Sequence, residues 1–276
     1  ELARIWRPTL LLVGSSSLPT DLEDPATAGI ETTAELKAAL LDRLRSEGRE
    51  VGPSDLERAY RSLLRAREIR QAIAAMRAQG AIVEYARADV RDTRTLGSVI
   101  QGWREKFGEP VGLIHGAGVI HDKLLRDKTP ESFDRVLGTK IDGALNLARL
   151  LKGDALRFAA LFSSVAGRFG NQGQSDYAAA NEVLNKLALW LDWQWPGRVV
   201  SINWGPWAGV GMVSDLQEHL GRRGLGMIDP AAGCAALVEE LRFGRKGEVE
   251  VILAGNLGSL EGPLLLPEAA QVRGSR

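Results

Sequence analysis

Six short apolar runs, separated by segments with helical periodicity, restrict most strongly what this chain can fold into. Each run has four or five residues and is largely apolar, which indicates a strand covered on both faces, as in a parallel sheet. Strands that alternate with helices predict a doubly wound α/β fold of the Rossmann type. The expected strands are Thr9–Val13, Ala81–Tyr85, Gly112–His115, Ala159–Phe162, Val199–Asn203 and Val249–Leu253.

The segments between these runs place apolar residues at helical spacing. Several of them end at a glycine or begin at a proline, as helices commonly do. The expected helices are Arg61–Gln79, Thr95–Phe107, Pro130–Val136, Lys140–Leu151, Tyr177–Trp193 and Pro230–Leu241.

A polar segment rich in Asp, Glu and Arg interrupts this rhythm at residues 19–58. It contains one helical stretch, Ala34–Glu47, bounded by proline and glycine breaks, so we expect a helical hairpin on the surface. The hairpin could be a solvated decoration or a docking face for a partner. We therefore predict one catalytic domain over residues 1–261, with this insertion, and a linker-like tail over residues 262–276.

The first residues do not match the usual beginning of a dinucleotide-binding fold, which is a strand, a glycine-rich turn and a helix. Residues 1–8, ELARIWRP, have the pattern of the end of that helix, and Thr9–Val13 then has the pattern of the second strand. We therefore expect the first strand and its glycine loop to precede Glu1 in a longer polypeptide.

Charge and cysteine content exclude several classes of function. Lys plus Arg equals Asp plus Glu at 35 each, so the chain lacks the basic excess of a nucleic-acid-binding or membrane-surface protein. No apolar run is long enough to span a membrane. Cys234 is the only cysteine, which fits a reducing, cytoplasmic location, and a packed thiol is favoured over a catalytic one. The three histidines show no zinc-ligand spacing, and we expect no metal site.

A serine, a tyrosine and an asparagine lie at a spacing with a chemical meaning. Ser164 precedes Tyr177 by thirteen residues, and Asn181 follows it by four. If the segment after Asp176 is helical, Tyr177 and Asn181 lie one turn apart on one face. A phenol and a hydroxyl brought together could bind a carbonyl oxygen and protonate it, which ketone reduction requires beside a hydride donor.

Four motifs carry a resemblance to a known family. With them the chain resembles, over nearly its whole length, the ketoreductase domains of modular and iterative polyketide synthases, a branch of the short-chain dehydrogenase/reductases. Together with the long insertion, they are most similar to the ketoreductase of polyunsaturated-fatty-acid synthases. The motifs are HGAGVIHDKLL (His115–Leu125), LGTKIDGALNL (Leu137–Leu147), FSSVAG…GQSDYAAAN (Phe162–Asn181) and NWGPW (Asn203–Trp207).

The resemblance implies catalytic roles for four matched positions. Tyr177 would donate the proton, and Ser164 would hydrogen-bond the substrate carbonyl. Most short-chain reductases have lysine four residues after the tyrosine and asparagine further upstream. Here Asn181 and the upstream Lys140 are exchanged, which resembles the polyketide ketoreductase pattern. Lys140 would lie beside the phenol and the nicotinamide ribose, and its charge would lower the pKa of Tyr177 below about 10.

The resemblance also implies NADPH (NADP) as the cofactor. Serine stands where arginine commonly meets the 2′-phosphate, so hydroxyls and amides would bind it without a positive charge. No acidic residue follows that strand to hold a free ribose hydroxyl, which argues against NAD. A plain strand-end turn remains the alternative for the glycine run and for the adenine pair. The implied contacts are Gly14, Ser15 and Ser16 for the phosphate, Asp89 and Val90 for adenine, Gly116, Ala117 and Gly118 for close backbone approach, and Pro206 and Trp207 for the carboxamide.

Three positions are implied to contact the substrate. Asp122 matches the last residue of a Leu-Asp-Asp motif in some of these reductases, and Phe169 stands where the opposite stereochemical class has tryptophan. These two positions favour a 3R hydroxyl. Met212 lies in residues 209–213, which would begin a substrate lid.

We therefore predict an NADPH-dependent reductase of 3-ketoacyl thioesters, acting as one domain of a multienzyme of polyketide or fatty acid biosynthesis. Its partners would be an acyl carrier protein with a phosphopantetheine-bound chain, and neighbouring domains. A non-catalytic scaffold or carrier-protein docking domain is the alternative, favoured by the missing glycine loop and opposed by the intact catalytic set. A nucleotide-sugar epimerase or dehydratase usually needs lysine where this chain has Asn181.

Overall fold

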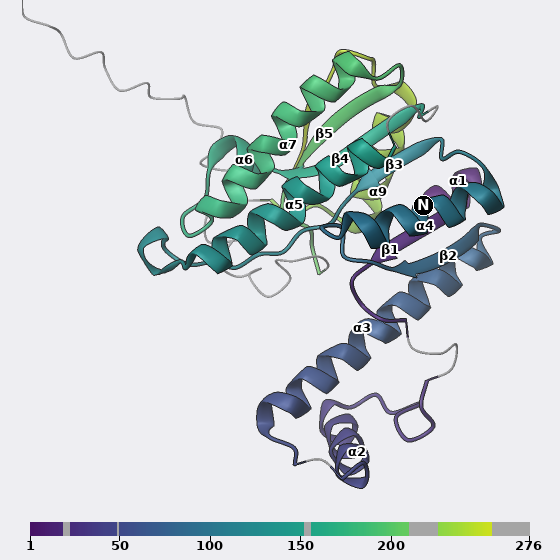
Figure 1. The fold of residues 1–276 in the computed structure, drawn as a ribbon, viewed down its shortest axis with the longest axis vertical. Coiled ribbons are helices and arrows are strands. Elements are labelled where there is room, and N and C mark those ends of the chain that lie inside the picture. The colour runs from purple at the N-terminus through teal and green to yellow at the C-terminus, as the bar shows by residue number, and fades with distance from the viewer. Residues whose placement is uncertain (19–22, 49, 152–155, 210–225, 256–276) are drawn as a thin grey trace, which may run out of the picture. The chain divides into compact units, whose positions relative to one another are not determined.

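The chain folds into two units (Figure 1). One comprises Glu1–Glu109 with Arg149–Lys152, and the other comprises Pro110–Ala148 with Gly153–Arg276. The computed structural model describes residues 1–18, 23–48, 50–151, 156–209 and 226–255. Met212, the lid around it and the tail at 262–276 lie outside the described residues.

The second unit is built on a parallel sheet of four strands in the order β3-β4-β5-β6. Helices follow each of the first three strands, which is the α/β alternation that the apolar runs predict. The strands are β3 (Gly112–His115), β4 (Phe158–Ser164), β5 (Arg198–Trp204) and β6 (Glu250–Leu253), and the helices are η1 (Leu125–Asp127), α5 (Pro130–Leu150), α6 (Val165–Phe169), α7 (Ser175–Gln194) and α9 (Pro230–Phe243).

Both faces of this sheet are buried, which explains why its strands are apolar at successive positions. Leu161 and Val199 pack into a core with α5 and α7. Ala160 and Val200, which are direct chain neighbours of these two residues, point to the opposite face, where α9 packs. Figure 1 shows α5 and α7 alongside each other over one face, with α9 behind the sheet. The predicted doubly wound, Rossmann-type architecture is thus confirmed.

The first unit contains a separate parallel pair of strands, β1 and β2, aligned from Thr9 opposite Ile82 to Gly14 opposite Arg87. Apolar residues of β1, β2, α1 and α3 form its core. The predicted strand before Glu1 concerns residues outside this chain and stays a prediction. The elements of this unit are α1 (Leu2–Trp6), β1 (Thr9–Gly14), α2 (Thr33–Ser46), α3 (Pro53–Ala78), β2 (Ile82–Arg87) and α4 (Thr93–Phe107).

The insertion is a pair of helices, but its second helix does not end where the sequence analysis placed the end of the insertion. Helix α3 begins at Pro53 and continues to Ala78, so the hairpin and the helix predicted from Arg61 are one element. Proline suits a first helical position, and Asp55 accepts a hydrogen bond from the backbone of Gly52 at 3.2 Å. These local signals fix the beginning of α3 eight residues earlier than the apolar periodicity indicates.

The helix expected to open at Pro130–Val136 and to continue over Lys140–Leu151 is the single helix α5. Gly138 lies between the two expected stretches, and a glycine inside a helix costs about 1 kcal/mol relative to alanine. Val136 and Lys140, on either side of it, are buried at 0% and 2% exposure, and their packing offsets that cost. None of the helices within the described ranges is long and apolar enough to cross a membrane.

His115, the last residue of β3, links that strand to α5. Its ring is 2% exposed. Because a backbone carbonyl can only accept, Nε2 carries the proton and donates to the carbonyl of Lys140 at 3.0 Å. Burial lowers the pKa of His115 to about 4, from 6.5. The imidazole is therefore neutral in the folded protein at every pH above that value.

We predict that this histidine makes the fold sensitive to acid. Since its pKa is lower in the folded state, the unfolded chain takes up the extra proton between pH 6.5 and 4, and stability is lost as the pH falls through that window. The loss amounts to about 3 kcal/mol at about 1.4 kcal/mol per pH unit. Urea unfolding at pH 7 and pH 4 should therefore show a smaller acid loss for His115→Gln than for the wild type. Equal losses would contradict the prediction.

Candidate active site

The candidate site lies in the second unit, where β4 ends and α6 and α7 follow. Ser164 is both the last residue of β4 and the residue that caps α6, because its Oγ accepts a hydrogen bond from the backbone of Ala166 at 3.2 Å. In open α/β sheets, ligands bind beyond the carboxyl ends of the strands. The predicted serine is therefore at the edge of the sheet where this fold places its chemistry.

Tyr177 lies in the first turn of α7, and Lys140 reaches it from α5. The lysine Nζ is 5.5 Å from the centre of the tyrosine ring. It donates a hydrogen bond to the backbone carbonyl of Phe162, in β4, at 2.8 Å. Both side chains are buried, at 7% exposure for Tyr177 and 2% for Lys140. The upstream lysine of the sequence pattern is thus held against the phenol ring by α5 and β4.

Asn181 lies one turn after Tyr177 on the same face of α7, as its spacing predicts. Its Nδ2 donates to the backbone carbonyl of Tyr177 at 2.7 Å. Its Oδ1 is buried and has no hydrogen-bond partner among the residues that the structure describes. Since buried acceptors are normally satisfied, this oxygen is available to a donor that the folded chain does not supply.

The electrostatics of Tyr177 differ from the prediction. Burial raises the pKa of the phenol, while hydrogen bonding by the side chains of Asn181 and Ser164 lowers it and the negative charge of Asp122 raises it further. Burial also lowers the pKa of Lys140 to about 8, from 10.5. The expected lowering of the tyrosine pKa by the lysine was therefore wrong, because desolvation disfavours both charged forms.

A buried polar network beneath α7 was missed by the sequence analysis. Ser163 Oγ donates to the backbone carbonyl of Asn181 and lies 3.1 Å from Asn203 Oδ1. Asn185 of α7 also donates to Asn203 and accepts from Ser201 at 2.7 Å. The network joins α7 to β4 and β5 behind the catalytic candidates. The sequence does indicate this network, because polar residues interrupt the otherwise apolar strands β4 and β5.

Some residues of this unit that were predicted to contact the nicotinamide also pack against other residues of the chain. A side chain at Gly118 would lie 3.0 Å from Cε of Lys140, so this glycine makes room for the lysine. Trp207 packs against Trp204, with ring centres 4.9 Å apart, and against Gly233. Gly116, Ala117 and Pro206 lie after the carboxyl ends of β3 and β5. Contact of these residues with a cofactor stays a prediction.

The predicted adenine and phosphate contacts belong to the first unit. A side chain at Gly14 would lie 2.7 Å from the hydroxyl of Tyr85, so the glycine lets that hydroxyl donate to the carbonyl of Ser16, also at 2.7 Å. Ser15 lies between them at the end of β1. Asp89 pairs with Arg91 at 2.7 Å, which lowers the pKa of its carboxyl. Val90 follows Asp89 in the loop before α4.

The substrate candidates lie around α6 and the loop after β3. Asp122 is exposed and accepts a hydrogen bond from Nε2 of Gln174 at 2.9 Å. Phe169 ends α6 with 38% of its surface exposed. Val119 and Ile120 pack against the cluster that contains Tyr177, so the loop bearing Asp122 lies next to the catalytic candidate.

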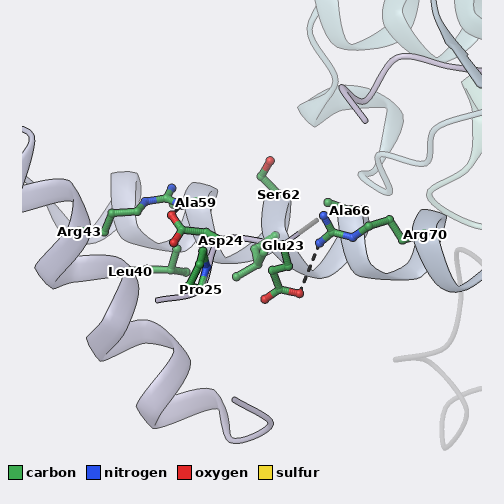
Figure 2. Close-up of a pocket in the computed structure, with 10 residues that line it drawn as sticks. Glu23, Asp24, Pro25, Leu40, Arg43, Ala59, Ser62, Ala66 and Arg70 are labelled. Atoms are coloured by element: carbon green, nitrogen blue, oxygen red, sulfur yellow. Dashed lines mark hydrogen bonds and ion pairs between the residues drawn. The ribbon is translucent and has the colours of Figure 1, made fainter. Parts of the chain in front are cut away.

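A hollow of about 650 Å³ lies in the insertion of the first unit, whereas the four catalytic candidates belong to the second (Figure 2). Its charged side chains pair with one another: Arg43 contacts Asp24 at 3.2 Å, and Arg70 contacts Glu23 at 3.4 Å. Arg67 holds the preceding loop through a two-pronged contact to Glu23 and the carbonyl of Thr27. We interpret this hollow as a gap in the packing between α2 and α3 and not as a ligand site, because its charged side chains form ion pairs with one another.

Known proteins match this chain over most of its length. The KR domain family matches residues 37–209. One chain of the polyunsaturated fatty acid synthase of a Thraustochytrium species is 36% identical over 246 residues, which is 88% of this chain and 8% of that protein. Polyketide synthase GfsB of Streptomyces halstedii is 38% identical over 179 residues, which is 62% of this chain and 3% of that protein. The chain thus spans a small part of these synthases.

Solved structures match as well. A ketoreductase domain from the bacillaene assembly line has 27% identity and a TM-score of 0.62, over 92% of this chain and 58% of that one. PlmKR1, the ketoreductase of the first module of phoslactomycin biosynthesis in a Streptomyces species, has 32% identity and a TM-score of 0.62, over 68% of this chain and 43% of that one. These matches establish that the chain belongs to the ketoreductase (KR) domains of polyketide and polyunsaturated-fatty-acid synthases, within the short-chain dehydrogenase/reductase superfamily.

Proposed function

We propose that this chain reduces a 3-ketoacyl thioester on an acyl carrier protein, with NADPH as the hydride donor, as one domain of a cytoplasmic multienzyme. The observation that carries the proposal is the packing of Lys140 and Asn181 against Tyr177, with Ser164 near enough for its side chain to lower the pKa of the phenol. Membership of the KR family and the similarity to synthases support the reaction class. The carrier protein and the neighbouring domains are the proposed partners.

Three of the four side chains take part in the proton chemistry. Ser164 donates a hydrogen bond to the ketone oxygen and stabilises the charge that develops there. Tyr177 is protonated near neutral pH, because burial raises the pKa of its phenol, and it can therefore act as the proton donor. The ammonium of Lys140 then stabilises the phenolate that remains. The bound nicotinamide supplies the hydride to the ketone carbon.

The residues at this site fit a nicotinamide nucleotide. An ammonium has three N–H donors, and one of those on Lys140 serves the carbonyl of Phe162. The others can hold ribose hydroxyls. Asn181 Oδ1, the buried acceptor without a partner among the described residues, can take a hydrogen bond from a water or a hydroxyl that enters with the ligands. Lys140 is accordingly the residue that we assign to the ribose.

Arg87 supplies the positive charge that the serines after β1 lack. It ends β2 directly opposite Gly14 in the register. Tyr85 is two residues earlier and so on the same face of the strand, and its hydroxyl reaches the carbonyl of Ser16. Burial raises the pKa of Tyr85, and the nearby charge of Arg87 opposes this. We therefore assign the 2′-phosphate of NADPH to Arg87 together with Ser15 and Ser16.

Removing that charge should weaken NADPH binding selectively. A hydrogen bond to a charged group contributes about 1.5–3 kcal/mol, so we expect Arg87→Ala to raise the Kd for NADPH by about tenfold or more. The Kd for NADH should stay unchanged, because NADH has no 2′-phosphate. Fluorescence titration of the whole protein measures both constants. Arg58→Ala, at a side chain that is 75% exposed on α3, is the matched control. An equal loss for both nucleotides would remove Arg87 from this role.

Tyr177→Phe should remove the proton donor and leave cofactor binding intact. A positioned general acid contributes about 10²–10⁴-fold, so the rate of NADPH oxidation with a 3-ketoacyl thioester should fall by that factor. The Kd for NADPH should change little, since the ring and its packing remain. Unchanged turnover would end the proposal. A wild-type protein that binds no NADPH would instead favour the non-catalytic scaffold.

The rate should also decline in alkaline solution as Lys140 loses its charge. Because the pKa of this amine is about 8, raising the pH through that value removes the cation that stabilises the phenolate. We expect kcat/KM to decrease above pH 8 in the wild type. Arginine keeps its proton to a pH above about 12, so Lys140→Arg should have a lower maximum without this alkaline decline. A decline at the same pH in both proteins would assign it to another group.

A further inference from the structure

A buried ion pair lies beside the catalytic tyrosine and has no part in the proton chemistry proposed above. Nζ of Lys128 is 2.8 Å from Oδ2 of Asp176, and the two side chains are only 2% and 1% exposed. Taking two charges out of water is costly, and it is repaid only when the remaining hydrogen-bonding groups of both ions find partners. The further contacts of these two ions are therefore informative.

Each ion of the pair also binds a backbone group, one in the loop at residues 119–128 and the other in α7. Lys128 also donates to the carbonyl of His121 at 2.8 Å, which closes the loop at residues 119–128 on itself. Oδ1 of Asp176 accepts from the backbone N–H of Tyr177 at 2.8 Å. The pair thus connects this loop to the backbone of the proton donor. The acidic residue also suits the first turn of α7, where the helix dipole favours negative charge.

Two more contacts join the same segments nearer the middle of the loop. The backbone N–H of Lys123 donates to the carbonyl of Gly173 at 3.0 Å. Gln174, which is 5% exposed at the start of α7, donates to the carboxylate of Asp122 at 2.9 Å. With Val119 and Ile120 packed against the cluster of Tyr177, the loop is fixed both to the beginning of α7 and to that cluster.

We infer that Lys128 and Asp176 are positioning residues that hold loop 119–128 against the start of α7, and so set where Asp122 lies and from which side a ketone reaches Tyr177. This inference rests on the proposed function. The loop carries a carboxylate whose charge acts on the phenol, and its residues Val119 and Ile120 pack against the cluster that contains Tyr177. A shift of the loop changes both the charge near the proton donor and the shape above it. Displacements of about 1 Å can cost a hundredfold in rate.

The test uses three variants of the whole protein. Lys128→Met combined with Asp176→Asn removes both charges together, which avoids leaving one buried ion unpaired. Asparagine keeps an acceptor for the backbone of Tyr177. Gln174→Met releases Asp122 while leaving the ion pair intact. Lys186→Met is the matched control, because Lys186 pairs with Glu182 at 2.9 Å on the same helix but is 63% exposed.

Three measurements are compared: kcat/KM with a racemisation-resistant 3-ketoacyl thioester, the ratio of the two hydroxyl epimers, and amide hydrogen exchange in residues 119–128. For the double variant we expect kcat/KM to fall between about ten- and a hundredfold, with a changed epimer ratio and faster exchange. Gln174→Met should change all three in the same direction, and Lys186→Met should change none. The Kd for NADPH should stay the same in all of them.

An unchanged epimer ratio and kcat/KM in a folded double variant would overturn the inference, because a merely structural pair changes stability alone. If that variant does not fold, Gln174→Met decides by the same criteria. If the wild-type protein reduces no 3-ketoacyl thioester, the proposed function fails. The exchange rates still test whether Lys128 and Asp176 hold the loop at residues 119–128. Faster exchange of residues 119–128 in the double variant then supports the role of the ion pair, and wild-type exchange in it overturns that role.

Discussion

The burial of one ammonium group organises the catalytic half of this protein. Lys140 extends from α5, donates to the backbone of β4 and lies over the ring of Tyr177. Its own carbonyl is bound by the buried imidazole of His115 at the end of β3. Gly118 has no side chain, because that space is filled by the lysine. A single charged residue thereby fixes the relative positions of two strands and two helices at the edge of the sheet.

That burial has a cost which shapes the chemistry. Removing a lysine and a tyrosine from water favours their neutral forms, so the pKa of the amine falls and that of the phenol rises. In the proposed reaction, the phenol would therefore hold the proton that is donated, and the cation would act when phenolate begins to form. The polar network of Ser163, Asn185 and Asn203 holds α7 behind this pair. The site is hydrogen-bonded to the sheet on one side, and Val119 and Ile120 of the loop at residues 119–128 pack against the cluster of Tyr177.

Much of the fold could be predicted from the sequence because its signals are local. Strand β3 has the predicted bounds, and β4 and β5 extend only one or two residues beyond theirs, since continuous apolar runs reflect burial on both faces. The error arose where capping overrides periodicity. Pro53 begins α3 eight residues before its apolar spacing does. The buried Lys128–Asp176 pair could not be predicted, because its residues are 48 apart and each resembles a surface charge.

The sequence by itself determined the alternation of strands and helices and the identities and spacings of Lys140, Ser164, Tyr177 and Asn181. These depend on neighbours along the chain, where the helical repeat places Asn181 one turn after Tyr177. Only the tertiary structure decided which groups are desolvated, and hence the directions of the pKa shifts at Tyr177 and Lys140. Desolvation depends on what the rest of the chain packs around a group, and spacing along the sequence carries no record of it.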